Sequence, residues 1–241
     1  MMKVQAVIFD LFGTLVDGFA ASSAGYHEEF AAALGVDHES FMQHWRQIAG
    51  NRTIGDFQTV EASIEHVCNR MGVSVTTEQM AKAVKIRLEL TRRALAPRSS
   101  AVSTVAQLKR ASFKIGLLSN CSIEIPLVWP ETDFAELFDC TVFSSRERLK
   151  KPDPRIYNVV CDRLGVPPES CIYVGDGENY ELAAAAQAGM HAVLIRNPSQ
   201  DYRSEILREA RDWRGDVISA LPEALTRVGI NADGSTPSNR T

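Results

Sequence analysis

The sequence has few cysteines, and no two of them are spaced as a CxxC pair. Their number, five, is odd, which disfavours both a set of paired disulfides and a cysteine-based zinc site. We interpret most of them as small buried hydrophobic side chains. Long apolar stretches are also missing: the longest runs from Phe30 to Val36, whereas a membrane-spanning helix needs ~18 or more apolar residues. The sequence therefore predicts no membrane-spanning helix.

Basic residues are not gathered into long runs, and acidic residues outnumber them by 30 to 26, for a net charge of −4. Nucleic-acid binding therefore lacks its usual electrostatic signature. The N-terminal segment lacks the cleavage pattern of a signal peptide, and its apolar stretch ends in Asp10. We expect a cytoplasmic protein with no nucleic-acid or membrane partner. The sequence does not decide between a monomer and a homodimer, and both stay open.

The length and composition are those of a globular protein. At ~150 residues per domain, 241 residues make one large domain or two modest ones. Hydrophobic residues make up 45% and charged residues 23%, both near the average for folded proteins. The chain is long enough to bury a core without disulfides or structural metals.

Short apolar segments and longer amphipathic segments alternate in most of the chain. The predicted strands are 4–9, 114–118, 141–143, 172–174 and 192–195. The predicted helices are 22–34 (beginning at Ser22 or Ser23), 38–49, 55–71, 77–95, 100–111, 153–164 and 178–188. Strands alternating with helices indicate a parallel sheet with right-handed crossovers, which is an α/β fold.

The segment after the first strand differs from the rest, because it contains helical patterns and no convincing strand. We therefore predict a helical domain at 17–97, inserted into an α/β core made of 1–16 and 98–230. The polar stretch 231–241 is predicted to be a disordered tail.

Polar side chains follow four of the predicted strands. In chain order they are Asp10 and Thr14, Ser119 and Asn120, Ser144 and Ser145 with Lys150 and Lys151 beyond them, and Asp176 and Glu181. Ligands of parallel sheets bind beyond the carboxyl ends of the strands, so we expect these groups to meet at one edge.

Three carboxylates, Asp10, Asp176 and Glu181, would crowd negative charge into this edge, which is unfavourable unless a cation compensates. Lys151, or Lys150 in its place, supplies one positive charge. The remaining charge predicts a hard divalent ion with oxygen ligands, for which Mg²⁺ fits best.

An ionised Asp10 beside a cation can act as a covalent nucleophile. The hydroxyl and amide groups of Thr14, Ser119 and Asn120 can hold the oxygens of an anionic substrate. We expect Asp10, Lys151 and Thr14 to be catalytic, and Ser119 and Asn120 to bind the substrate.

Four segments in this order, DLFGTLVD, LLSN, KKPDPRIY and VGDGENYELAAAAQAGM, resemble motifs I to IV of the haloacid dehalogenase superfamily of hydrolases. The resemblance covers residues 4–197. It implies a Rossmann-like core, a mobile helical cap between motifs I and II, and an aspartyl-ester intermediate on Asp10. The insertion 17–97 is similar to that cap.

Two positions depart from the pattern of the family's phosphatases. Phe12 stands where many of them carry a second Asp as general acid and base, although its backbone carbonyl can still be a metal ligand. A phenyl ring cannot transfer a proton, and general acid–base catalysis is typically worth ~10²–10⁴-fold in rate. In motif IV the usual position of the second acid is occupied by Tyr180. Glu181, one residue later, matches the motif better because it stands eight residues before Gly189, as the motif's second acid does, and the loop before it is longer. Asp176 favours a metal, because the family's dehalogenases carry neutral groups there.

The resemblance also suggests substrate contacts outside the four motifs. Arg46 is similar to a cap arginine that binds the substrate carboxylate in the dehalogenases, and Arg52 is an alternative. Tyr157 faces either the pocket or a helix-packing interface. Phe12 lies beside the nucleophile and is expected to contact the substrate.

Three functions follow as hypotheses. The first is a Mg²⁺-dependent, phosphatase-like hydrolase that acts on a small anionic substrate through Asp10. The second is a metal-independent (S)-2-haloacid dehalogenase, indicated by Phe12, Lys151, Tyr157 and Arg46. The third is a ligand-binding protein without catalysis, indicated by the missing acid at position 12.

Overall fold

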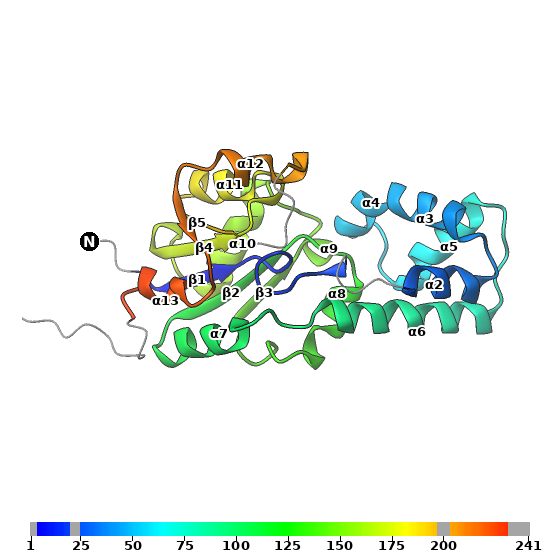
Figure 1. Cartoon of the computed structure of the whole chain (residues 1–241), viewed down its shortest axis with the longest axis horizontal. Helices are drawn as coiled ribbons and strands as arrows, with labels where there is room; N and C mark the ends of the chain where they lie inside the picture. The colour runs from blue at the N-terminus through cyan, green and yellow to red at the C-terminus, as the bar shows by residue number, and fades with distance from the viewer. Residues whose placement is uncertain (1–3, 20–24, 197–202, 231–241) are drawn as a thin grey trace, which may run out of the picture.

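A six-stranded parallel sheet forms the centre of the computed structural model, which describes residues 4–19, 25–196 and 203–230 (Figure 1). The strands are β1 (Ala6–Phe9), β2 (Lys114–Ser119), β3 (Cys140–Phe143), β4 (Cys171–Gly175), β5 (His191–Ile195) and β6 (Asp216–Ile218). Their order is β3-β2-β1-β4-β5-β6, so β1 lies between β2 and β4. The predicted α/β fold is confirmed, and the reversal of strand order beside β1 creates a crevice at its carboxyl end.

Helices cover both faces of the sheet. Figure 1 shows α7 and α13 on one face and α10, α11 and α12 on the other. Together with the short helices α8 and α9, the core contains α7 (Ala101–Arg110), α8 (Glu124–Val128), α9 (Ser144–Glu147), α10 (Pro154–Leu164), α11 (Glu181–Gln187), α12 (Arg208–Asp212) and α13 (Glu223–Arg227). Along β1, Val7 and Phe9 pack into one apolar cluster while Ala6 and Ile8 pack into the other. Alternate residues of a strand point to opposite faces, so burial on both faces explains its continuous apolar sequence.

The helical insertion lies beside the sheet, near α8 and α9, which follow β2 and β3 (Figure 1). It contains α2 (Tyr26–Leu34), α3 (His38–Gln47), α4 (Ala49–Thr53), α5 (Val60–Arg70) and α6 (Thr77–Ala94). Phe30, Phe41 and Trp45 pack ring against ring in an apolar core of its own. We propose that 17–97 form a cap domain on a core of 1–16 and 98–230. The predicted tail, 231–241, lies outside the described residues.

Several predicted helix boundaries are wrong for local reasons. The helix expected over 55–71 begins only at Val60, because Thr59 caps it and Gly55 has a positive φ. The helix expected over 178–188 is interrupted because Asn179 and Tyr180 are both left-handed, with φ of 53° and 62°. The predicted start at Ser22 or Ser23 lies outside the described residues.

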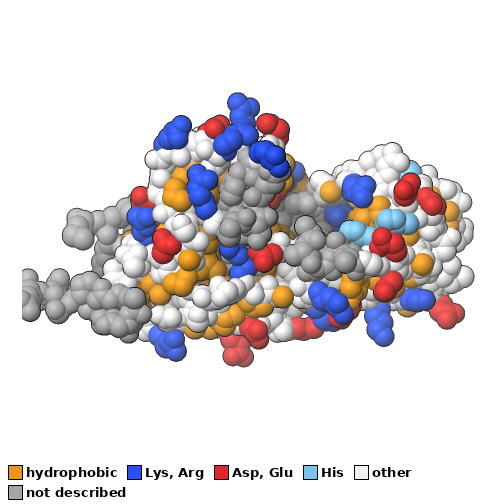
Figure 2. Space-filling model, in the orientation of Figure 1, with side chains coloured by type: hydrophobic (Ala, Val, Ile, Leu, Met, Phe, Trp, Pro, Cys, Tyr) orange, Lys and Arg blue, Asp and Glu red, His pale blue; other side chains and the backbone are white. Residues whose placement is uncertain are grey.

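Figure 2 shows side chains of both charges on this face, with Lys and Arg side chains gathered at the top of the core among a few acidic ones. Within the described residues, no helix is both long and apolar enough to cross a membrane.

The insertion contacts the core closely at α9. The Ser144 hydroxyl donates a hydrogen bond of 2.7 Å to the carbonyl oxygen of Thr53, and Gly55 lies against the backbone of Ser145. Gly55 has φ of +79°, and a Cβ there would overlap the Ser145 carbonyl oxygen. This contact therefore requires glycine.

We expect Gly55→Ala to destabilise the protein by about 1–3 kcal/mol, since it combines an overpacked contact with an unfavourable φ. Urea unfolding at equilibrium measures the change. Gly50→Ala is the matched control in the same segment: no heavy atom lies within 4 Å of its added Cβ, so stability should be unchanged or slightly raised. Equal stability of the two variants would contradict the proposed close contact.

Candidate active site

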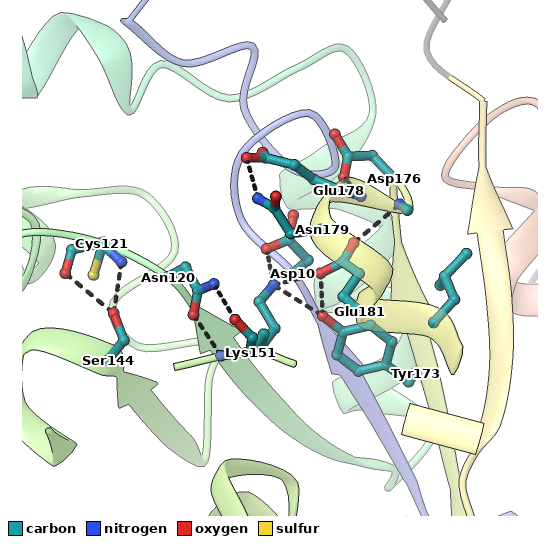
Figure 3. A network of polar contacts seen from close by, with 12 residues as sticks. Asp10, Asn120, Cys121, Ser144, Lys151, Tyr173, Asp176, Glu178, Asn179 and Glu181 are labelled. Carbon is teal, nitrogen blue, oxygen red and sulfur yellow. Dashed lines mark hydrogen bonds and ion pairs between the residues drawn. The ribbon is translucent and has the colours of Figure 1, made fainter. Parts of the chain in front are cut away.

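Lys151 is the centre of a buried polar network at the carboxyl end of β1 (Figure 3). Its Nζ lies 2.5 Å from Oδ1 of Asp10, 2.5 Å from Oε2 of Glu181 and 3.0 Å from the hydroxyl of Tyr173. Only 4% of the Lys151 side chain is exposed, whereas Lys150 is exposed. Burial alone lowers the pKa of a lysine, but Asp10 and Glu181 raise that of Lys151 above its usual value. The ammonium group therefore stays charged between two carboxylates.

Asn120 positions the backbone of Lys151. Its side-chain amide donates to the Lys151 carbonyl oxygen at 3.0 Å, and its Oδ1 accepts from the Lys151 backbone N–H at 2.8 Å. Asn120 directly follows β2, so this pair of bonds ties the loop carrying Lys151 to the sheet. The sequence predicted a substrate contact for Asn120. The structure shows that its amide already has backbone partners.

Glu181 is held from several sides. Its Oε2 accepts from the Tyr173 hydroxyl at 2.6 Å, and its Oε1 accepts from the Gly177 N–H at 3.1 Å. Tyr180, the alternative acid position, is 51% exposed and lies outside this network. Tyr157 is buried, and its hydroxyl donates to the Glu181 backbone carbonyl at 2.9 Å. Tyr157 therefore stabilises the backbone at Glu181, and its contact with substrate stays a prediction.

Three carboxylates converge beside Lys151. Asp10, Asp176 and Glu181 are all buried and each offers an oxygen within 4.8 Å of the others. Burial raises the pKa of Asp10 to about 7, since the charge of Lys151 only partly offsets it and Glu181 adds to it. Burial, with Glu181 and Asp10, raises the pKa of Asp176 well above its usual value. Ionisation of all three carboxylates would therefore exceed the single positive charge of Lys151.

The predicted metal ligands fit a hard cation by their chemistry, because three carboxylate oxygens at this spacing are the donors that Mg²⁺ prefers. Two of the three, Asp10 and Glu181, are already bonded to Lys151. Phe12 packs its ring on Phe19, with centroids 5.7 Å apart, and a role for its carbonyl as a ligand stays a prediction.

The hydroxyls of Thr14 and Ser119 are buried without a well-aligned hydrogen-bond partner in the described part of the chain. Thr14 follows β1 and Ser119 ends β2, so both lie at the same edge of the sheet as Asp10. Buried hydroxyls rarely lack hydrogen-bond partners. Because a hydroxyl can donate a hydrogen bond to an oxygen, these two groups can bind the oxygens of an anion.

A cavity of about 330 Å³ lies between the insertion and the sheet. Its wall includes Phe12, Asn120, Trp45, Arg46, Arg52 and Arg87. Arg46 is exposed, and Arg52 and Arg87 are more deeply buried. Arg87 and Tyr173 were missed from sequence, because one lies in a helical pattern and the other inside an apolar strand.

Comparison with known proteins gives consistent results. A family model for haloacid dehalogenase-like hydrolases matches residues 4–189. The (S)-2-haloacid dehalogenase 1 of Pseudomonas sp. (strain CBS-3) is 27% identical over 240 residues, which are 95% of this chain and 99% of that protein. The glyceraldehyde 3-phosphate phosphatase of Methanothermobacter thermautotrophicus is 26% identical over 231 residues, covering 92% of this chain and 100% of that protein.

Among solved structures, the L-2-haloacid dehalogenase from Xanthobacter autotrophicus with chloropropionic acid covalently bound shares the fold. The TM-score is 0.60 at 21% identity, over 93% of this chain and 98% of that chain. The match of the family model to most of the chain agrees with the four motifs and with the fold. This chain belongs to the haloacid dehalogenase-like family and is a hydrolase.

Proposed function

We propose that this protein is a metal-independent (S)-2-haloacid dehalogenase, which is the second of the three functions considered from sequence. The main observation in its favour is the position of Lys151, 2.5 Å from both Asp10 and Glu181, because the chain itself supplies the cation beside the nucleophile. Phe12 also favours it, since halide leaves carbon without needing a proton. The names of relatives such as the Pseudomonas sp. enzyme support it over a phosphatase.

In the first step, an Asp10 carboxylate oxygen attacks C2 of the 2-haloacid, and the carbon–halogen bond breaks with its electron pair leaving on the halide. The product of this step is an ester between Asp10 and the alkanoate. Water then adds to the Asp10 carbonyl carbon, and the 2-hydroxyacid leaves as Asp10 regains its carboxylate and a proton is released. Lys151 stabilises the negative charge on Asp10 at the start and on the ester oxygen during water attack.

The substrate carboxylate would be held by the hydroxyls of Thr14 and Ser119, which lack a well-aligned partner among the described residues. The rings of Phe12 and Trp45, which line the cavity, would contact the carbon chain. Arg46, at the exposed side of the same cavity, would attract the anion as it enters.

A Mg²⁺-dependent phosphatase is the second candidate, favoured by one observation: the convergence of Asp10, Asp176 and Glu181. These residues would hold the ion, which would polarise an oxygen of a phosphoryl group. The phosphatase relative supports this alternative. Phe12 has no acidic side chain, so this position cannot donate a proton to a poor leaving group.

One experiment separates these functions. We expect chloride release from (S)-2-chloropropionate by the purified protein, unchanged by EDTA. No halide release, together with EDTA-sensitive hydrolysis of p-nitrophenyl phosphate in the presence of Mg²⁺, would establish the phosphatase instead. Turnover of neither substrate class, with binding retained, would favour the ligand-binding hypothesis.

The pH dependence follows from the raised pKa of Asp10, about 7. Only the ionised carboxylate attacks carbon, and a raised pKa means that the group gains its proton as the pH falls through that value. We expect kcat/KM for chloride release to fall about tenfold per pH unit below ~7 and to level off above it. A profile that stays flat down to about pH 5 would contradict this assignment.

A location in the cytoplasm stays a prediction from the sequence, and a monomer and a homodimer both stay open. A small anionic molecule is the partner that the proposed chemistry requires.

A further inference from the structure

Two arginines of the insertion converge on one carboxylate of the core. Nη1 of Arg52, on α4, lies 3.2 Å from Oε1 of Glu124, and Nε of Arg87, on α6, lies 2.7 Å from the same oxygen. Glu124 begins α8, after β2. The exposed fractions of the three side chains are 11%, 6% and 2%, so the group is buried where the two parts of the protein meet.

Most hydrogen-bond donors of this pair have no partner among the described residues. Each guanidinium has one N–H bonded to Glu124, and Nε of Arg52 is buried with no partner among the described residues. Aromatic rings hold both groups in place: the Arg52 guanidinium lies 4.1 Å from the Trp45 ring centroid and that of Arg87 lies 4.6 Å from the Phe19 centroid. Arg52 and Arg87 both line the cavity, so the two guanidinium groups are held beside an open space.

The charges around the cavity do not balance. Arg52 and Arg87 line it and share the single carboxylate of Glu124, which leaves one positive charge of this buried pair without an ion-pair partner among the described residues. Burying unpaired positive charge is costly, and a bound anion removes that cost. A substrate whose single carboxylate is held by Thr14 and Ser119 would leave this charge uncompensated.

We propose that Arg52 and Arg87 form a binding site for a second, distal carboxylate of the substrate, with Glu124 as the positioning residue that holds both guanidinium groups. The preferred substrates are then short 2-halodicarboxylates: one carboxylate occupies the hydroxyls near Asp10, and the other reaches the arginine pair through the cavity. Asn120, whose side chain bonds to the Lys151 backbone, and Phe12 line the same cavity. This inference rests on the proposed dehalogenation and extends it to a substrate class.

The test compares 2-chlorosuccinate with 2-chlorobutyrate, which has the same number of carbons but one carboxylate. We expect wild-type kcat/KM to favour chlorosuccinate by ~10–100-fold, the worth of charge-assisted hydrogen bonds, mostly through KM. Arg52→Gln should remove this preference, and Arg52→Lys should keep part of it. Glu124→Gln, which frees both guanidinium groups, should reduce it. Arg70→Gln, an exposed arginine of the insertion bonded to Gln47, is the matched control and should keep it in full.

No preference in the wild-type enzyme, or a preference lost in Arg46→Gln but kept in Arg52→Gln, would overturn the inference. Binding provides a readout that does not depend on turnover. In Asp10→Asn, calorimetry should show that succinate binds more tightly than butyrate, and Asp10→Asn combined with Arg52→Gln should bind both equally. If neither halide substrate is turned over, the dehalogenation proposal fails, while equal binding of succinate and butyrate would separately refute the arginine site.

Discussion

Replacing Asp10 with Asn should abolish turnover while the protein stays folded. An amide is neutral and a poor nucleophile, so no ester forms, and the loss expected for removing a nucleophile is ~10⁴–10⁶-fold in kcat. The fold should survive because the change removes one of three crowded negative charges, while Lys151 keeps its ion pair with Glu181. Chloride release and thermal unfolding, measured on the same preparation, test both parts.

The matched control for this change is Asp162→Asn, an exposed aspartate on α10 away from the network. It should retain wild-type activity. Turnover by Asp10→Asn within tenfold of the wild-type rate would contradict the role of Asp10 as nucleophile.

Replacing Lys151 with Met should impair both activity and stability. The change leaves Asp10 and Glu181 buried without their shared cation, and removing one partner of a buried ion pair typically costs about 3–5 kcal/mol. Without the nearby positive charge, the pKa of Asp10 should rise further, so less of it is ionised at neutral pH. We expect kcat to fall by ~10²–10³-fold, as for other lost electrostatic stabilisers.

Lys150→Met is the control, since Lys150 is adjacent in sequence but exposed. It should leave the midpoint of urea unfolding and the rate of chloride release unchanged. If Lys150→Met were the more damaging substitution, the lysine assignment would be wrong.

Most of the sheet could be predicted from sequence because its central strands are buried on both faces and read as apolar runs. β6 was missed because it has only three residues, Asp216–Ile218, of which only Ile218 is buried. α8 was missed because Pro126 interrupts any helical pattern there. Such short elements depend on tertiary contacts more than on local preference.

The grouping of site residues could also be predicted, because the carboxyl ends of parallel strands share one edge. The structure buries Lys151 and Glu181 at this edge, whereas Lys150 is exposed and Tyr180 is half-exposed. The catalytic and metal-binding roles of Lys151 and Glu181 stay predictions. Ion pairs between residues far apart in the chain could not be predicted from the sequence. Glu124 is 72 residues from Arg52 and 37 from Arg87 in the chain, and no local pattern signals that they meet.

The central claim, that an oxygen of Asp10 is transferred to carbon, can be tested with a single turnover in ¹⁸O-labelled water and excess enzyme. We predict that the 2-hydroxyacid product of (S)-2-chloropropionate carries unlabelled oxygen at C2, and that mass spectrometry finds ¹⁸O in the peptide containing Asp10. The oxygen leaves with the product, and water replaces it on the enzyme. Labelled oxygen at C2 of the first-turnover product, with an unlabelled Asp10 peptide, would mean that water attacks the substrate directly and would contradict the account.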